Sequence, residues 1–79
     1  MNVRVRFWKD EAQGYASSRD YLYFTRLPLR IYDEVVAPTR SNPMQRAIVT
    51  QVNVPDSEIS LSYAYNLKEI TEYWRENAK

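Results

Sequence analysis

The sequence predicts a mainly β fold: a small single-domain barrel of about five strands with a short C-terminal helix. Three observations predict it, namely the alternating side chains of residues 2–8, an aromatic strand over 20–25 and a hairpin pattern over 35–54. The 79 residues make one domain, near the lower size limit for a self-supporting core. Packing of the seven Tyr, two Trp and two Phe side chains is expected to supply much of the stability.

The first strand is expected over residues 2–8. Apolar side chains at positions 3, 5 and 7 alternate with Arg4, Arg6 and Trp8, which is the period of a strand with one buried face. Residues 9–18 contain the only glycine and are expected to form a loop.

The second strand is expected over residues 20–25, with Tyr21 and Tyr23 on one face. Residues 27–31 contain a proline and are too short for a helix. We expect them to cross one end of the barrel and to close it with Leu29 and Ile31.

The third and fourth strands are expected to form a β-hairpin. Residues 35–37 form a short strand that stops at Pro38, because proline cannot donate to a ladder. The turn-forming residues 40–43 then lead into a long strand over 45–54. Apolar side chains on both faces of this strand predict a central position in the sheet, and residues 55–58 are expected to turn.

The C-terminal segment favours a helix over about 67–77. Asn66 followed by Glu69 is an N-cap pattern. Apolar side chains then recur at spacings of four, three and four, as on one helical face: Tyr63, Leu67, Ile70 and Trp74.

Composition argues against an enzyme. The chain has no cysteine and no histidine, which removes disulfides, thiolate metal sites, the commonest general base and the usual zinc ligand. It also contains no nucleophile elbow, no phosphate-binding glycine loop and no metal-ligand spacing. We expect a non-catalytic protein that needs no metal or cofactor.

Charge and hydropathy indicate a cytoplasmic protein. No apolar run approaches the roughly 20 residues that span a bilayer, and the first residues lack a signal-peptide core. The net charge of +1 is too small to identify a partner. Residues 1–54 carry eight Lys and Arg against five Asp and Glu, or +3, whereas residues 55–79 carry three against five, or −2.

Two surfaces have alternative interpretations. Arg4, Arg6 and Trp8, with Tyr21 or Tyr23 alongside, form either a stacking platform for single-stranded nucleic acid or a solvated strand face with Trp8 over the barrel mouth. The second surface is aromatic, and its tyrosines and tryptophan either pack across the barrel or bind a protein. Its members are Tyr63, Tyr65, Tyr73 and Trp74.

From Asp20 onward the sequence resembles two related groups. The resemblance lies in Asp20-Tyr21-Leu22-Tyr23, in Tyr32-Asp33-Glu34-Val35-Val36-Ala37-Pro38-Thr39, and in Ala47-Ile48-Val49-Thr50-Gln51-Val52. One group comprises small uncharacterised bacteriophage and prophage proteins, and it also shares the Val-Arg-Val-Arg-Phe first strand. The other is the N-terminal DNA-binding domain of the primosomal replication-restart helicase, which grips the 3′ end of a nascent strand.

The helicase resemblance implies a pocket for a terminal nucleotide. It assigns Asp20 and Tyr21 to that pocket, together with Lys68 as a pocket lysine. Arg40 lies near a position where that family has glycine, so its side chain is expected to occupy part of the pocket. The resemblance also implies that residues 67–73 form a closing strand, which leaves strand and helix open for 67–70.

Two functions are expected from these patterns. The first is a small phage-type accessory protein that binds nucleic acid, as single-stranded DNA or a DNA 3′ end. The second is a protein-binding module that engages a host or phage protein through Arg, Tyr and Trp side chains.

Overall fold

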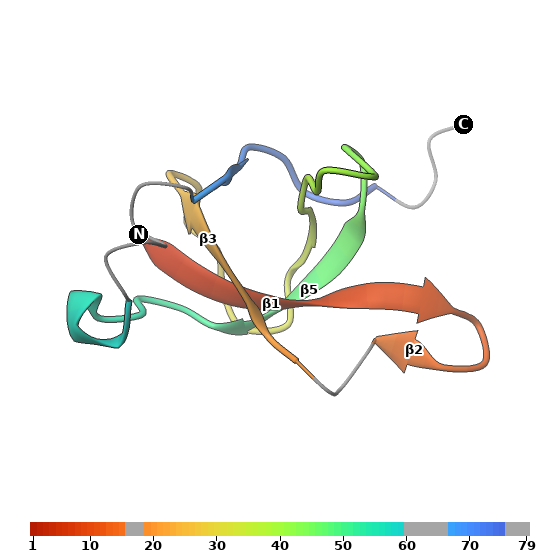
Figure 1. The fold of residues 1–79 in the computed structure, drawn as a ribbon, viewed down its shortest axis with the longest axis horizontal. Helices are drawn as coiled ribbons and strands as arrows, with labels where there is room; N and C mark the ends of the chain where they lie inside the picture. The colour runs from red at the N-terminus through yellow and green to blue at the C-terminus, as the bar shows by residue number, and fades with distance from the viewer. Residues whose placement is uncertain (16–18, 60–66, 76–79) are drawn as a thin grey trace.

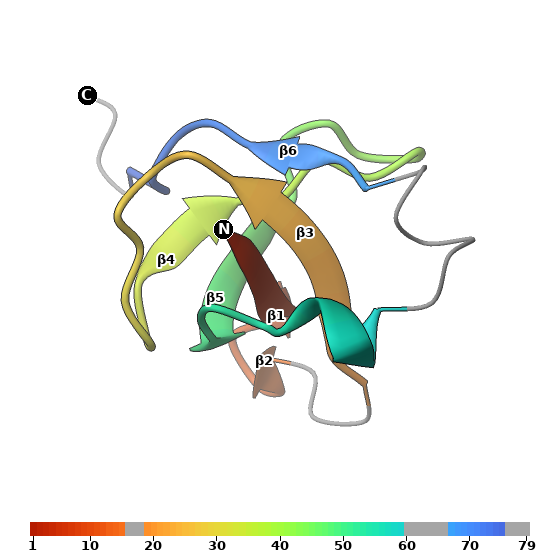
Figure 2. The same ribbon diagram turned by 90° about the vertical axis from the view of Figure 1, so that its left-hand side faces the viewer.

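The computed structural model describes residues 1–15, 19–59 and 67–75, and it shows a mainly β molecule. One sheet runs in the order β4-β5-β1-β3-β6, and β2 pairs with β1 alone. Viewed from one end, these strands follow one another around a ring (Figure 2). The predicted small β-barrel is therefore confirmed. Its strands are β1 (Asn2–Asp10), β2 (Gly14–Tyr15), β3 (Tyr21–Thr25), β4 (Glu34–Val36), β5 (Arg46–Gln51) and β6 (Glu69–Ile70).

β1 is the central strand, antiparallel to β3 on one side and to β5 on the other. Its alternation places Val3 and Val5 in the core, where neither is exposed. Phe7 packs against the edge of the same core. The end of β1 runs on beyond its two neighbours and projects from the barrel with β2 (Figure 1).

The loop predicted over residues 9–18 was wrong at its start. β1 continues to Asp10, and Gly14 and Tyr15 return as β2 against it. The turn is possible because Gly14 takes a φ of 65°, a conformation that glycine adopts without a steric penalty. Residues 16–18 lie outside the described part of the chain.

The predicted β4–β5 hairpin is confirmed, and β5 lies between β4 and β1 as its two apolar faces indicated. β5 is shorter than the predicted 45–54. Asn53 has a φ of 51°, which an extended strand does not accommodate. Val54 beyond it is still buried, and its N–H donates to the Asn2 carbonyl at 2.9 Å.

The core fills the inside of the ring and includes one of the two predicted plugging residues. Leu29 is buried, whereas Ile31 is 47% exposed, because Ile31 lies in a turn that the Asp33 N–H closes by donating to the Arg30 carbonyl at 3.1 Å. The expectation for Ile31 was therefore wrong. The core residues are Val3, Val5, Tyr23, Leu29, Val35, Ala37, Ala47, Val49 and Ile70.

The C-terminal segment closes the ring by pairing with β3 and β4. The helix predicted from residue 67 was therefore wrong for residues 67–75. β6 pairs with β3 in parallel, with Thr25 opposite Ile70. The next residues run antiparallel to β4, where the Trp74 N–H donates to the Glu34 carbonyl at 2.9 Å. The closing strand implied by the resemblance is thus present in short form. Asn66 and residues 76–77 lie outside the described residues.

Candidate nucleic-acid interface

A hollow of about 440 Å³ lies on the inner face of β1 and β3, at the end of this face that extends beyond the buried core. Along this face Val5 is fully buried, and Tyr21 opposite it is 36% exposed. We call the site the aromatic hollow. It is lined by Phe7, Tyr21, Tyr23, Pro38, Thr39, Arg40 and Lys68.

Three aromatic rings form one wall of the aromatic hollow. The rings of Phe7 and Tyr21 stack at 4.4 Å with 9° between their planes, and Tyr23 meets Phe7 edge-on at 6.4 Å. The Tyr23 hydroxyl donates to the Pro38 carbonyl at 2.8 Å. Burial raises the pKa of Tyr23 to about 12, so the hydroxyl remains a neutral donor at neutral pH. The aromatic wall is therefore fixed from two sides.

The wall that carries Arg40 is a tied loop. The Thr39 N–H donates to the Asn42 carbonyl at 2.9 Å, and the Thr39 hydroxyl accepts from the Asn42 N–H at 2.9 Å. The Asn42 side chain in turn accepts from the Met44 N–H at 3.0 Å. This network holds the backbone around Arg40 in one conformation.

The two cations of the aromatic hollow, Arg40 and Lys68, are exposed. Within residues 1–15, 19–59 and 67–75, neither has a carboxylate partner within salt-bridge distance. The Lys68 carbonyl accepts from the Phe24 N–H at 3.0 Å, which fixes the lysine backbone against β3. A third cation, Arg19, lies over the Tyr21 ring at 5.7 Å, so a base that stacks on this ring takes the place of the guanidinium. This side of the molecule therefore presents positive charge beside the aromatic wall.

Two of the three residues assigned by the helicase resemblance meet in this hollow. Tyr21 and Lys68 both line it, although they come from β3 and from the segment before β6. Asp20 does not line it, because its carboxylate accepts from the Arg6 Nε at 2.6 Å. Arg40 lines the hollow and leaves space beside it.

The predicted platform of Arg4, Arg6 and Trp8 lies on the outer face of β1, and each side chain has a different partner. Arg4 pairs with Glu58 at 3.2 Å, and Arg6 pairs with Asp20. Trp8 lies under the Arg46 guanidinium, 4.3 Å from its ring centroid. The three residues share a face and do not form one joint stacking surface with Tyr21.

Arg46 is the centre of a cluster that sequence reasoning missed. Its guanidinium donates to Glu34 at 2.8 Å and lies over the rings of Trp8, Tyr15 and Trp74. The Tyr15 hydroxyl donates to the same carboxylate. Side chains from β1, β2, β4, β5 and the C-terminal segment therefore meet at one guanidinium, and no local pattern around Arg46 predicts this.

The cluster shifts three pKa values in the directions expected for a paired charge. Hydrogen bonds from Tyr15 and Arg46 lower the pKa of Glu34. Burial and the bond to Glu34 raise the pKa of Tyr15 to about 12, and the bond to Glu34 raises the pKa of Arg46. Glu34 pairs with both Tyr15 and Arg46 on the outer face, so we interpret the cluster as structural.

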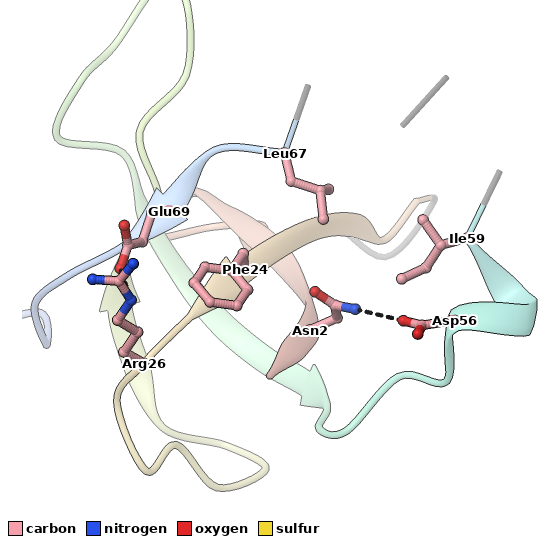
Figure 3. A pocket seen from close by; sticks show the side chains of 7 residues that line it. All are labelled: Asn2, Phe24, Arg26, Asp56, Ile59, Leu67 and Glu69. Atoms are coloured by element: carbon pink, nitrogen blue, oxygen red, sulfur yellow. Dashed lines mark hydrogen bonds and ion pairs between the residues drawn. The ribbon is translucent and has the colours of Figure 1, made fainter. Parts of the chain in front are cut away.

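A second, larger hollow of about 610 Å³ lies beside β3 and β6 (Figure 3). Its charges are balanced, because Arg26 lies 3.9 Å from Glu69 and the Asn2 amide donates to Asp56 at 3.5 Å. Arg26 also covers the Phe24 ring at 6.0 Å. Its polar groups have partners within the protein, and it is lined by Asn2, Phe24, Arg26, Asp56, Ile59, Leu67 and Glu69.

Sequence reasoning missed Phe7, Tyr23 and Thr39 as members of the aromatic hollow. The buried face predicted for residues 2–8 already contained Phe7, but the sequence gives no indication that this face opens at one end. The placement of Tyr21 or Tyr23 beside the outer-face arginines was wrong, because these tyrosines lie opposite the buried Val5 and Val3. Of the predicted aromatic surface, Tyr63 and Tyr65 lie outside the described residues. Tyr73 is 36% exposed, and Trp74 contacts Arg46.

Among the described ranges, no cluster of three or more Asp, Glu, His or Cys side chains is arranged to hold a metal ion. The same ranges contain no helix with the length and hydropathy needed to cross a membrane. Comparisons of the chain with protein-family models, with curated proteins and with solved structures found no match. The resemblance described above therefore stays a prediction.

Proposed function

We propose that this is a small non-catalytic protein that binds single-stranded nucleic acid through the aromatic hollow. The observation that carries the proposal is the meeting of two exposed cations, Arg40 and Lys68, with the exposed ring of Tyr21 in one hollow. Single strands are bound in this way elsewhere, by cations that follow the phosphates and by aromatic rings on which bases stack. The resemblance to the helicase domain points to the same class of ligand.

Rigidity of the site supports the proposal further. Phe7, Tyr23 and the tied loop at 39–42 fix the walls before any ligand arrives. A pre-formed site loses less side-chain entropy on binding than a mobile one. The small net charge of +1 is compatible with a short footprint of two or three phosphates.

The test is fluorescence anisotropy with a short single-stranded oligonucleotide at several salt concentrations. Two neutralised phosphates give a slope of log K against log salt of about −1.4 for a single strand. We expect Lys68→Gln to reduce the size of this slope by about 0.7. We expect Tyr21→Ala to weaken binding by about 1–3 kcal/mol through loss of stacking.

Arg30→Gln is the matched control, because Arg30 is an exposed arginine outside the hollow. It should leave affinity and salt slope close to those of the parent, and thermal melting would verify the fold of each variant. Absence of binding at low salt, or equal binding by the parent and by Tyr21→Ala, would contradict the proposal.

A second candidate function is protein binding through Ile31 and Tyr32. These neighbouring side chains are 47% and 77% exposed at the tip of the turn over residues 30–33. Exposed Tyr next to Arg30 fits the composition of interface hot spots. A partner captured from nuclease-treated lysate by the parent and lost by Tyr32→Gly, with oligonucleotide binding absent, would favour this candidate. Such an aromatic contact should weaken little with salt.

A further inference from the structure

We infer that the aromatic hollow selects a phosphate monoester at the end of a nucleic-acid strand over a hydroxyl end. This inference rests on the proposed function and adds the chemical group that is recognised. Three features of the hollow carry it: its charge, the occupation of its hydroxyl groups and the position of Asp20.

Charge is the first feature. Two of the seven lining side chains are cations, Arg40 and Lys68, and none is a carboxylate. A phosphodiester inside a strand carries one negative charge, whereas a terminal monoester carries about −1.5 to −2 at neutral pH. The terminal group therefore matches the two cations more closely than any internal phosphate does.

The second feature is that two of the three hydroxyl groups lining the hollow already have partners within the protein. The Tyr23 hydroxyl donates to Pro38, and the Thr39 hydroxyl both donates to and accepts from the backbone of Asn42. These two hydroxyls already have partners. The groups that remain open for a strand end are the Tyr21 hydroxyl and the two positively charged donors, so donated hydrogen bonds and positive charge dominate what the hollow offers.

The third feature is the pairing of Asp20. The carboxylate that could accept a bond from a terminal hydroxyl is held by the Arg6 Nε at 2.6 Å and does not line the hollow. Recruiting it would break that ion pair. Arg40, by contrast, is held on a tied loop and offers the planar fork that matches phosphate oxygens.

The experiment compares oligonucleotides of one sequence, internally labelled, that end in 3′-phosphate, 3′-hydroxyl, 5′-phosphate or 5′-hydroxyl. We expect a phosphate at one end to tighten binding by about fivefold, which corresponds to the upper range of one exposed ion pair. The preference should shrink as the pH falls below about 6, because the doubly charged monoester there takes up one proton and keeps a single negative charge. Competition with a nucleoside monophosphate shows whether the ligand is a free nucleotide or the end of a strand.

The variants locate the preference. Arg40→Gln and Lys68→Gln should each reduce the phosphate-to-hydroxyl ratio toward one while stacking-dependent binding persists. Arg30→Gln and Lys9→Gln remove exposed cations outside the hollow and should retain the ratio.

Equal affinity for phosphate and hydroxyl ends in the parent would overturn this inference and leave the proposed function standing. A preference for a free 3′-hydroxyl that is lost in Asp20→Ala would also overturn it, in favour of recognition by that carboxylate. Absence of binding to every oligonucleotide removes both the inference and the proposed function.

Discussion

Tyr32 adopts a backbone conformation that tyrosine rarely takes. Its φ is 78°. Two hydrogen bonds hold the turn over residues 30–33. The Tyr32 N–H donates to the Val49 carbonyl at 2.8 Å, and the Arg30 N–H donates to the Asp33 carboxylate at 2.8 Å. A left-handed conformation costs a residue with a Cβ roughly 1–2 kcal/mol. The side chain is 77% exposed, so burial offsets little of this cost.

Replacement of Tyr32 by glycine should therefore stabilise the protein. Glycine removes the strain but increases the entropy of the unfolded chain by roughly 0.5–1 kcal/mol. We expect a net gain of about 0.5–1 kcal/mol in the free energy of unfolding, measured by urea denaturation. Ile31→Gly is the control, because Ile31 does not have a positive φ, and it should be destabilising. A Tyr32→Gly protein less stable than the parent would show that the tyrosine makes a stabilising contact in solution.

Glu34 should make stability depend on pH. Hydrogen bonds from Tyr15 and Arg46 lower the pKa of this carboxyl below its ordinary value of 4.5. The bonded carboxylate thus adds to the free energy of unfolding at pH values above 4.5. This stabilisation is lost as the pH falls from about 4.5 through the lower pKa that the carboxyl has in the folded protein. We expect the parent to lose more free energy of unfolding between neutral pH and a pH of about 3 than Glu34→Gln does.

Urea denaturation at the two pH values measures this difference. Glu11→Gln removes an exposed carboxylate from the turn after β1 and controls for the change in total charge. Equal acid sensitivity of the parent and Glu34→Gln would contradict the role assigned to the Arg46 cluster.

At the scale of elements, the two-residue strand β6 is the piece that completes the barrel. It is parallel to β3, whereas every other strand pair is antiparallel among the described strands. Ile70 is fully buried inside the ring, and its carbonyl accepts from the Thr25 hydroxyl at 2.9 Å. Ile70 therefore joins the C-terminal segment to the core through both its side chain and its carbonyl.

Truncation of Ile70 should open the barrel. We expect Ile70→Ala to reduce the free energy of unfolding by about 2–5 kcal/mol, the range for a buried aliphatic side chain replaced by alanine. Thr71→Ala changes the exposed neighbour and should have little effect. Chemical denaturation followed by tryptophan fluorescence measures both variants. Similar stability of the two would mean that the C-terminal segment contributes little to the core.

Elements with a local period could be predicted from the sequence, and elements defined by distant contacts could not. β1 and the β4–β5 hairpin follow directly from alternation and turn residues. The apolar spacing at Leu67, Ile70 and Trp74 predicted a helix, yet each residue has a different environment. Leu67 lines the second hollow, Ile70 lies in the core, and Trp74 contacts Arg46 on the outside.

The same distinction applies to the candidate site. Tyr21 and Lys68 were assigned through the resemblance, and the fold brings them together from segments more than 40 residues apart in the chain. Asp20 was assigned with them, but its neighbour across the sheet is Arg6, and the ion pair between them is a property of strand register that residue types do not reveal.

On the scale of the whole molecule, the barrel and its projecting hairpin have different roles. The principal extents are 38 × 25 × 23 Å, and the long dimension follows β1 into its hairpin with β2 (Figure 1). In this hairpin Tyr15 contacts Glu34 and Arg46, so the Arg46 cluster anchors the projecting hairpin to the barrel. The aromatic hollow lies on the inner face of β1 and β3, so the face that carries the Arg46 cluster is separate from the face available to a ligand.

Closure of the ring by residues 69–74 has a consequence for synthesis. A ribosome makes β1 to β5 first, and these strands form an open sheet whose two edges, on β3 and β4, have no partners. Unpaired edges are templates for aggregation, and a nascent chain adds only about 5–20 residues each second. The sheet therefore exposes both edges until residues 69–74 reach it and the Trp74 N–H bonds to the Glu34 carbonyl. The yield of folded protein thus depends on how soon these residues cover the two edges after synthesis.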